Sequence, residues 1–321
     1  MRYALVPLLL AVAAASGNAF AADAYPAKPM RWVIPYPPGG PVDVVARPVA
    51  QKLTEAWGQP IVLDARPGAG TIIGSEMVAK SAPDGYTLLL TSAGHAVVPS
   101  IYSKLPFDTA KDFTPLSQFV SGPFILAVHP SVPVKTVREL IAFAKPRAGQ
   151  ILYASAGTGS VNHMSGELFK TMARIDIVHV PYKGGAPATI DLVGGHVAMM
   201  FHSIVGVFPY VKTGRLRALA VTTPKRSVLV PDIPNMAEAG LPGFEVETWY
   251  GALGPAGLPR DIVDKLSREF DRILKLPEMS ERFHRQGVEP TGGAPEHFGA
   301  RIASDIAKWA KVAKESGARA D

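Results

Sequence analysis

The sequence predicts an α/β fold organised in two lobes. Short β-rich runs alternate with stretches of helical length along all 321 residues, and this alternation is typical of βα units with parallel sheets. The chain is also longer than most single domains. A strand, a paired-glycine turn and a helix follow one another at Gly39-Gly40 and again at Gly184-Gly185. This repetition suggests two similarly built lobes that face each other.

The first residues are typical of an export signal. Arg2 is followed by an almost uninterrupted apolar run from Tyr3 to Ala15, and Ala19-Phe20-Ala21 matches an A-x-A cleavage site. That run is too short to span a bilayer. We therefore expect residues 1–21 to be a cleaved signal peptide, with a short buried helix as the alternative. Because the chain has no cysteine, a disulfide framework, a thiolate metal site and a lipid-modified cysteine are excluded.

The β-rich runs predict the strands. We expect strands at 31–35, 61–64, 87–91, 124–129, 151–154, 177–180, 198–201, 218–221 and 248–253. The helix after the first strand is the clearest, because apolar residues recur at helical spacing from Val42 to Trp57 and Pro41 suits a first turn. Pro48 lies inside this helix and should kink it.

Two further helical regions have recognisable limits. Thr136 and Glu139 form a capping-box pattern, which should open a helix that runs to Lys145. The chain from Asp261 onward is helical in pattern, apart from a loop expected around residues 287–293.

The charge pattern and the missing motifs exclude several functions. The net charge is +6, but basic residues are dispersed and only Lys225-Arg226 is an adjacent pair, so we expect no nucleic-acid surface. Mild steering of an anionic small molecule and a generic solubilising surface both stay open. His196 and His202 have poor metal spacing, and the sequence lacks G-x-S-x-G and H-E-x-x-H motifs. We therefore expect no metal, no cofactor and no enzymatic activity.

The turn VIPYPPGGPVDVV, residues 33–45, has the composition of an anion-binding site. A helix N-terminus leaves backbone N–H groups unpaired and carries a partial positive charge, so it can bind a carboxylate or phosphate without a charged side chain. Gly39 and Gly40 would let a ligand approach the backbone closely. VHVPYKGGAPATIDLV, residues 178–193, has the same order. The alternative is that both are tight turns and nothing more.

A second glycine-rich segment, YASAGTGSVNHMSGELF at residues 153–169, also joins a strand to a helix. It offers the hydroxyls of Ser155, Thr158 and Ser160 together with exposed amides. The order of residues is not that of a nucleotide P-loop, because no lysine follows the glycines. A carboxylate is therefore the better candidate ligand than a nucleotide.

Three side chains near these turns have two interpretations each. His95 follows a strand end, where it could line a cleft or belong to a plain loop. His163 lies in the first turn of a predicted helix, where it could donate to an anion or have no contact with a ligand. Asp43 is either a capping acid or a group that orients a water, ammonium or hydroxyl.

Taken in order, the motifs resemble Bug-type extracytoplasmic solute-binding receptors of tripartite tricarboxylate transporter systems. The resemblance covers essentially the whole mature chain. It rests on PYPPGGPVDVVAR, ARPGAGTIIGSE, APDGYTLLLTS, PFDTAKDFTPLS, YASAGTGSVNHMSGELF, VPYKGGAPATIDLVGGHVAMMF, RLRALAVTTPKRSVLVPDIPNMAEAGLPGFE and WYGALGPAGLP.

The resemblance implies a type II-like periplasmic-binding-protein fold, with two mostly parallel sheets flanked by helices and joined by two crossovers. Lobe 1 would comprise residues 22–122 and 248–321, and lobe 2 residues 123–247, with crossovers near 118–123 and 247–251. It further implies a periplasmic monomer without lipid anchor. Such a protein closes on a small organic acid and hands it to integral membrane transporter subunits.

The resemblance also assigns the ligand contacts. They fall at the strand-to-helix turns of both lobes and include Pro38, Gly39, Gly40, Asp43, Ser92, His95, Ala156, Gly157, Thr158, Gly159, Ser160, His163, Tyr182, Lys183, Gly184 and His202.

Three positions depart from the family pattern. Pro48 replaces an ordinary helix former, and Ala65 replaces the asparagine common before R-P-G-A-G. His202 stands where an aspartate is usual, which removes a negative charge and disfavours a ligand with an ammonium group. Two other functions stay open: a secreted hydrolase or lyase that uses His95 or His163 with a serine, and a ligand sensor for a signalling partner.

Overall fold

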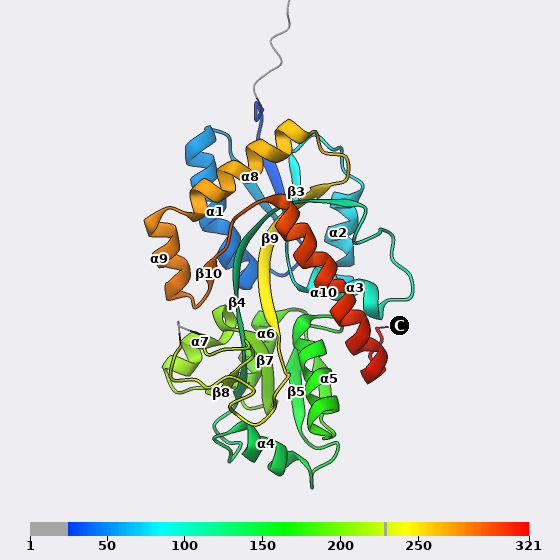
Figure 1. Ribbon diagram of the computed structural model, residues 1–321, viewed down its shortest axis with the longest axis vertical. Coiled ribbons are helices and arrows are strands. Elements are labelled where there is room, and N and C mark those ends of the chain that lie inside the picture. Colours follow the sequence, from blue (N-terminus) through cyan, green and yellow to red (C-terminus); the bar gives the residue numbers. More distant parts are fainter. Residues whose placement is uncertain (1–24, 228–229, 321) are drawn as a thin grey trace, which may run out of the picture.

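The computed structural model describes residues 25–227 and 230–320 and shows two α/β halves stacked along the long axis (Figure 1). The expected signal peptide lies outside the described residues. Two long strands, β4 (Phe113–Val128) and β9 (Glu247–Pro255), run from one half into the other. The described strands pair in the order β2-β1-β3-β9-β4-β7-β5-β6, with β8 and β10 also on β4.

Parallel and antiparallel pairing occur in different parts of the fold. β1 pairs in parallel with β2 and β3, and β5 with β6 and β7. The crossing strands pair antiparallel with each other, with β3 on one side and with β7 and β8 on the other. The predicted two-lobed α/β fold is confirmed, but the sheets are mixed where mostly parallel ones were expected, because both crossing strands pair antiparallel with all their neighbours. The remaining strands are β1 (Met30–Ile34), β2 (Ile61–Ala65), β3 (Thr87–Ser92), β5 (Leu152–Ser155), β6 (Val178–Pro181), β7 (Met199–Ser203), β8 (Arg217–Val221) and β10 (Glu289–Pro290).

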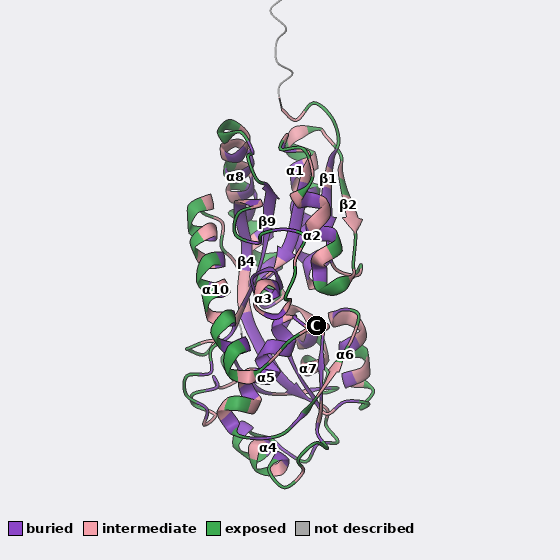
Figure 2. Cartoon of the chain, turned by 90° about the vertical axis from the view of Figure 1, so that its right-hand side faces the viewer, coloured by how far each residue is buried: buried purple, intermediate pink, exposed green. Residues whose placement is uncertain are grey.

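Helices cover the outer faces of these strands, and their exposed sides point to solvent (Figure 2). They are α1 (Pro41–Trp57), the 3₁₀ turn η1 (Ala69–Thr71), α2 (Ile72–Ala79), α3 (Gly94–Ile101), α4 (Val137–Ala144), α5 (Val161–Ala173), α6 (Gly185–Val193), α7 (Ile204–Lys212), α8 (Arg260–Leu274), α9 (Pro277–Arg285) and α10 (Pro295–Ser316).

The sequence located most elements but missed the first part of β4. The prediction began at residue 124, whereas the strand begins at Phe113. Proline and glycine interrupt the apolar pattern at Pro115, Gly122 and Pro123. The pairing with β9 tolerates the interruption because its register shifts between Pro115 and Ser117 and again farther along, as expected of bulged strands.

Two helix starts have the predicted chemistry. Pro41 occupies the first turn of α1, and this helix continues through the buried Pro48 as one element of 17 residues. At α4, the Thr136 hydroxyl accepts the Glu139 N–H at 3.1 Å. The Glu139 carboxylate accepts the N–H of Lys135 at 2.6 Å, so the capping-box prediction is confirmed with the reciprocal bond one residue earlier.

The C-terminal helix α10 contacts both halves. It packs on α3 of the first half, on α5 of the second and on the crossing strand β4. The buried Trp249 of β9 donates its indole N–H to Asp305 at 2.8 Å, and Arg301 bonds both Asp305 and Glu247 at 3.1 Å. After the helix, the Ala320 N–H donates to the Ile101 carbonyl at 3.0 Å. α10 is therefore fastened to a crossing strand by buried polar contacts.

Replacing Asp305 with alanine should lower the free energy of unfolding by about 1 to 3 kcal/mol, because the Trp249 N–H would stay buried without an acceptor. Asp305→Asn keeps an acceptor oxygen and should lose less. Urea unfolding measures the change. Glu315→Ala on the same helix removes only an exposed ion pair with Lys311 and should have little effect. Equal losses in Asp305→Ala and Glu315→Ala would contradict the assigned role.

Candidate functional site

A cleft of about 780 Å³ lies between the two halves. Its walls come from successive strand-to-helix junctions of both halves, namely the starts of α1, α5, α6 and α7 and the turns at Gly68 to Thr71 and Ser92 to Gly94. Ligands of open α/β sheets bind outside the carboxyl ends of the strands. The cleft is therefore the candidate binding site.

The starts of α1 and α6 present unpaired amides to this cleft. Their N-cap residues are Gly40 and Gly184, and neither helix has a side-chain cap. Both residues line the cleft, one from each half. Because the first-turn N–H groups of a helix have no intrahelical acceptor, these two turns can each donate to an anion. This arrangement agrees with the sequence-based interpretation of the two glycine turns.

The turn before α5 is built differently. The Gly157 N–H donates to the Ser155 hydroxyl at 3.0 Å, and the Gly159 N–H donates to Nδ1 of His163 at 3.3 Å. The Ser160 hydroxyl caps the helix by accepting the His163 N–H at 3.2 Å. Two of the amides that we expected to face a ligand are thus already paired within the protein.

Most of the predicted contact residues line the cleft. They are Gly40, Ser92, Ala156, Gly157, Thr158, Gly159, Ser160, Tyr182, Lys183, Gly184 and His202. Pro38, Gly39, Asp43, His95 and His163 are not among the lining residues. Contact between any of them and a ligand stays a prediction.

Asp43 has the contacts of a capping acid. Its side chain is buried and its carboxylate accepts the Gly39 N–H at 2.9 Å. Arg47, one turn later in α1, pairs with the same carboxylate at 3.0 Å. Asp43 therefore fixes the glycine turn in place and has its charge balanced, so the structure favours the capping interpretation over direct ligand contact.

His95 is a core residue behind the wall of the cleft. It is 1% exposed and lies edge-on to Phe113, with ring centroids 4.8 Å apart. Burial lowers the pKa of His95 to about 4, because the charged imidazolium would lose its hydration. Sequence position alone could not show this, since His95 lies at a strand end but its side chain points into the core.

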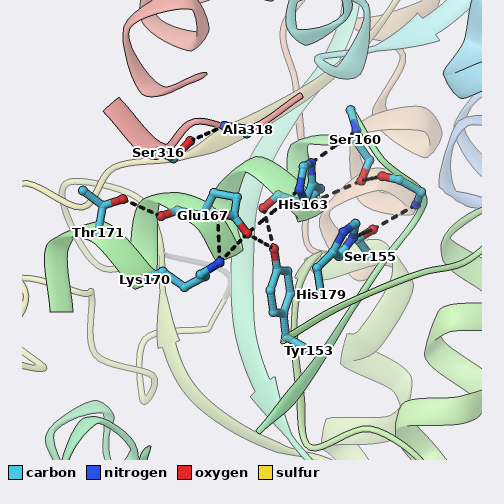
Figure 3. Close-up of polar contacts among 12 residues, drawn as sticks. Tyr153, Ser155, Ser160, His163, Glu167, Lys170, Thr171, His179, Ser316 and Ala318 are labelled. Atoms are coloured by element: carbon cyan, nitrogen blue, oxygen red, sulfur yellow. Dashed lines mark hydrogen bonds and ion pairs between the residues drawn. The ribbon is translucent and has the colours of Figure 1, made fainter. Parts of the chain in front are cut away.

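His163 belongs to a buried polar cluster behind the α5 turn (Figure 3). Its ring stacks on His179 with centroids 4.1 Å apart, and burial lowers the pKa of both histidines. Nε2 of His179 lies 2.6 Å from the Ser155 hydroxyl. The Gly159 amide thus donates to His163 itself, and the Gly157 amide donates to Ser155, whose hydroxyl contacts His179. The two rings therefore support the shape of the turn.

Glu167 completes this cluster. Its carboxylate accepts the Tyr153 hydroxyl at 2.6 Å and pairs with Lys170 at 3.1 Å. His179, Glu167 and Tyr153 were not predicted as site residues, because they lie on three different elements, β6, α5 and β5. No spacing in the sequence indicates that these elements place the side chains together.

His202 is buried beneath the start of α6 and carries no charge at neutral pH. Its Nδ1 lies 3.3 Å from the Ser203 hydroxyl, and burial lowers its pKa to about 4. A Cβ atom on Gly185 would lie 2.6 Å from its ring, and one on Gly206 would lie 2.5 Å from it. The imidazole therefore fits only because both neighbours are glycines.

The cleft has few charged groups and several aromatic side chains. Among the described residues that line it, Lys183 is the only Lys, Arg, Asp or Glu. Tyr36, Phe124 and Tyr250 also line it and were missed by the sequence analysis. Tyr36 lies within the first glycine-turn motif, so its position beside the turn was a signal from which contact with the cleft could have been predicted.

The two halves touch at the rim of the cleft. A Cβ atom on Gly184 would lie 2.9 Å from Pro37, and one on Gly159 would lie 2.3 Å from Ile101. Both glycines have positive φ values, 122° and 82°. The described structure thus has its lobes in contact, and larger residues at these glycines would hold them apart.

Within 25–227 and 230–320, no three His, Asp or Glu side chains gather as a metal site would require. The helices of the same ranges are each too short or too polar to cross a bilayer.

The buried histidines predict a pH dependence of stability. His95 has a pKa of about 4 in the folded protein and about 6.5 when unfolded. Above pH 6.5 both states are neutral, whereas between pH 6.5 and 4 only the unfolded chain takes up the proton. Stability should therefore fall on acidification across this window, and His95→Gln should reduce the slope by up to about 1.4 kcal/mol per pH unit.

Urea unfolding between pH 7 and pH 4.5 measures this slope. His284 is exposed on α9, so His284→Gln is the matched control and should keep the parent slope. The same slope in His95→Gln and in the parent protein would show that His95 does not stay neutral in the folded state.

Comparisons with known proteins agree on one family. The profile of the family described as "Tripartite tricarboxylate transporter family receptor" matches residues 45–318. Protein BugT of Bordetella pertussis is 38% identical over 300 residues, 93% of this chain and 92% of that protein. R. palustris Rpa4515 with adipate has a TM-score of 0.88 at 37% identity, covering 91% of this chain and 98% of that one.

A second solved structure, MatC (Rpa3494) from Rhodopseudomonas palustris with bound malate, has a TM-score of 0.86 at 32% identity and covers 90% of this chain and 99% of that one. The family match spans most of the chain and both lobes. The chain thus belongs to the tripartite tricarboxylate transporter receptor family, the Bug-type solute-binding receptors.

Proposed function

We propose that this receptor captures a small carboxylate-bearing metabolite by lobe closure and delivers it to a tripartite tricarboxylate-type membrane transporter. The observation that carries the proposal is the pair of uncapped helix starts, at Gly40 and Gly184, that enter one cleft from opposite halves. The relatives with adipate and malate support the carboxylate class. In this proposal the chain is exported to the periplasm by residues 1–21 and acts as a monomer without lipid anchor.

The binding energy can come from backbone donors alone. A hydrogen bond to a charged group contributes about 1.5 to 3 kcal/mol, and micromolar affinity requires about 8 kcal/mol. A few such bonds, less the cost of ordering, are enough. Because each half supplies only part of the donor set, the ligand favours the closed state, and the closed shape is what a membrane partner can recognise.

Closure would proceed by bending of the two crossing strands. The proposed lobes are residues 22–122 with 248–321, and residues 123–247, so both boundaries fall within β4 or β9. A hinge at these strands would move α1 relative to α6. Binding should reduce the radius of gyration in solution scattering, and an unchanged radius with saturating ligand would count against closure.

The ligand should lack an ammonium group. The neutral His202 faces the cleft, and the described lining residues include no carboxylate to pair with a cation. A calorimetric panel of mono-, di- and tricarboxylates and amino acids tests this. Tighter binding of amino acids than of dicarboxylates would overturn it. Incubation with esters and acids, followed by a search for product, separates binding from turnover.

Gly184→Ala should weaken carboxylate binding at least tenfold, because the added Cβ would lie 2.9 Å from Pro37 and keep the lobes apart. The positive φ of Gly184 adds backbone strain, which must be controlled. Gly214 has a φ of 70°, and a Cβ atom added there would have nothing within 4 Å, so Gly214→Ala has strain without the clash. Calorimetry should show parent-like affinity in Gly214→Ala. Equal losses of affinity in both variants would refute the clash as the cause.

A further inference from the structure

The volume of the cleft indicates the size of the ligand, because the lobes are already in contact. Pro37 meets Gly184 and Ile101 meets Gly159 across the rim, yet a volume of about 780 Å³ remains between them. This is in the range of sites that hold ligands of drug size. An acid of four carbons would leave most of this space to water, so the volume favours a ligand with a larger body.

Two tyrosines of the wall, Tyr36 and Tyr182, have their hydroxyls bonded to other side chains of the protein. The Tyr36 hydroxyl lies 2.7 Å from the Ser92 hydroxyl, and the Tyr182 hydroxyl donates to Asp191 at 2.7 Å. A phenol whose hydroxyl has a protein partner offers the ligand mainly its ring. These side chains therefore present apolar surface to the cleft.

Some polar side chains of the wall are also bonded within the protein. Ser92 lines the cleft and is the partner of Tyr36, and the Ser203 hydroxyl lies 3.3 Å from Nδ1 of the buried His202. The Asn162 amide is also used, since it donates to the Phe201 carbonyl at 2.7 Å. The Thr71 hydroxyl, which also lines the cleft, has no partner within the described residues. The aromatic rings of the wall thus favour an apolar ligand body, and few of its polar side chains are left to bind one.

From these contacts we infer that the ligand is a carboxylate with an extended apolar body, either an aromatic ring or an unbranched chain of six or more carbons. This inference rests on the proposed carboxylate-binding function and specifies its substrate class. The carboxylate lies at the helix starts of α1 and α6. The body lies along Tyr36, Phe124 and Tyr250, where burial of apolar surface supplies the selectivity.

Titration calorimetry of the full mature chain with benzoate, hexanoate, adipate, succinate, malate and citrate tests the inference. At least one of benzoate, hexanoate and adipate should bind at least tenfold more tightly than malate and citrate. The benzoate and hexanoate arms distinguish a ring from a chain. Malate or citrate binding as tightly as the best apolar acid would overturn the inference while leaving the proposed function intact. If none of the acids bound, the proposed function itself would fail.

Tyr36 provides a matched pair of variants for the best apolar acid. Tyr36→Phe keeps the ring and should change its affinity less than threefold, whereas Tyr36→Asn removes the ring and should lower it at least tenfold. Succinate binding in the same variants reports on the carboxylate site and should change much less. A parallel loss for both ligands in Tyr36→Asn, or a tenfold loss in Tyr36→Phe, would contradict an apolar contact at this wall.

Discussion

The site depends on two helices that begin without a side-chain cap. At the starts of α1 and α6 the N-cap residue is glycine, so first-turn amides are left for an external acceptor. An anion between the two turns would satisfy donors of both lobes at once. The surrounding contacts protect this arrangement, because Asp43 is neutralised by Arg47 and His202 is kept neutral by burial. Asp43 therefore adds no unbalanced negative charge beside the donors, and His202 adds no positive charge that would compete with them.

Three of the turns that line the cleft, those before α1, α5 and α6, differ in the hydrogen bonds that their backbone makes. The first turns of α1 and α6 have no side-chain cap, whereas the α5 turn is held by Ser155 and by the stacked His163 and His179. A turn whose amides are already bonded loses less freedom when a ligand arrives. α5 thus supplies a preformed wall. α1 and α6 thus offer uncapped helix starts from the two halves, on helices that approach each other across the rim.

Much of this architecture could be predicted from the sequence because local chemistry determines it. Apolar β-branched runs located the strands, and paired glycines after Pro-Tyr located both helix starts in the cleft. The first part of β4 was missed because bulged pairing with β9 depends on a strand more than a hundred residues later in the chain. The inward direction of the His95 and His163 side chains could not be predicted, since position in a turn does not show which face is buried.

His202, Gly185 and Gly206 form a single packing unit with a consequence for how ligand preference can evolve. The two glycines leave a space that the imidazole fills. A shorter residue introduced alone at position 202 would leave a hollow under α6, and a larger residue at either glycine would collide with the ring. The charge at this point of the cleft is therefore linked to the volume of two neighbours. A switch between neutral and acidic character here requires coordinated replacement of several side chains.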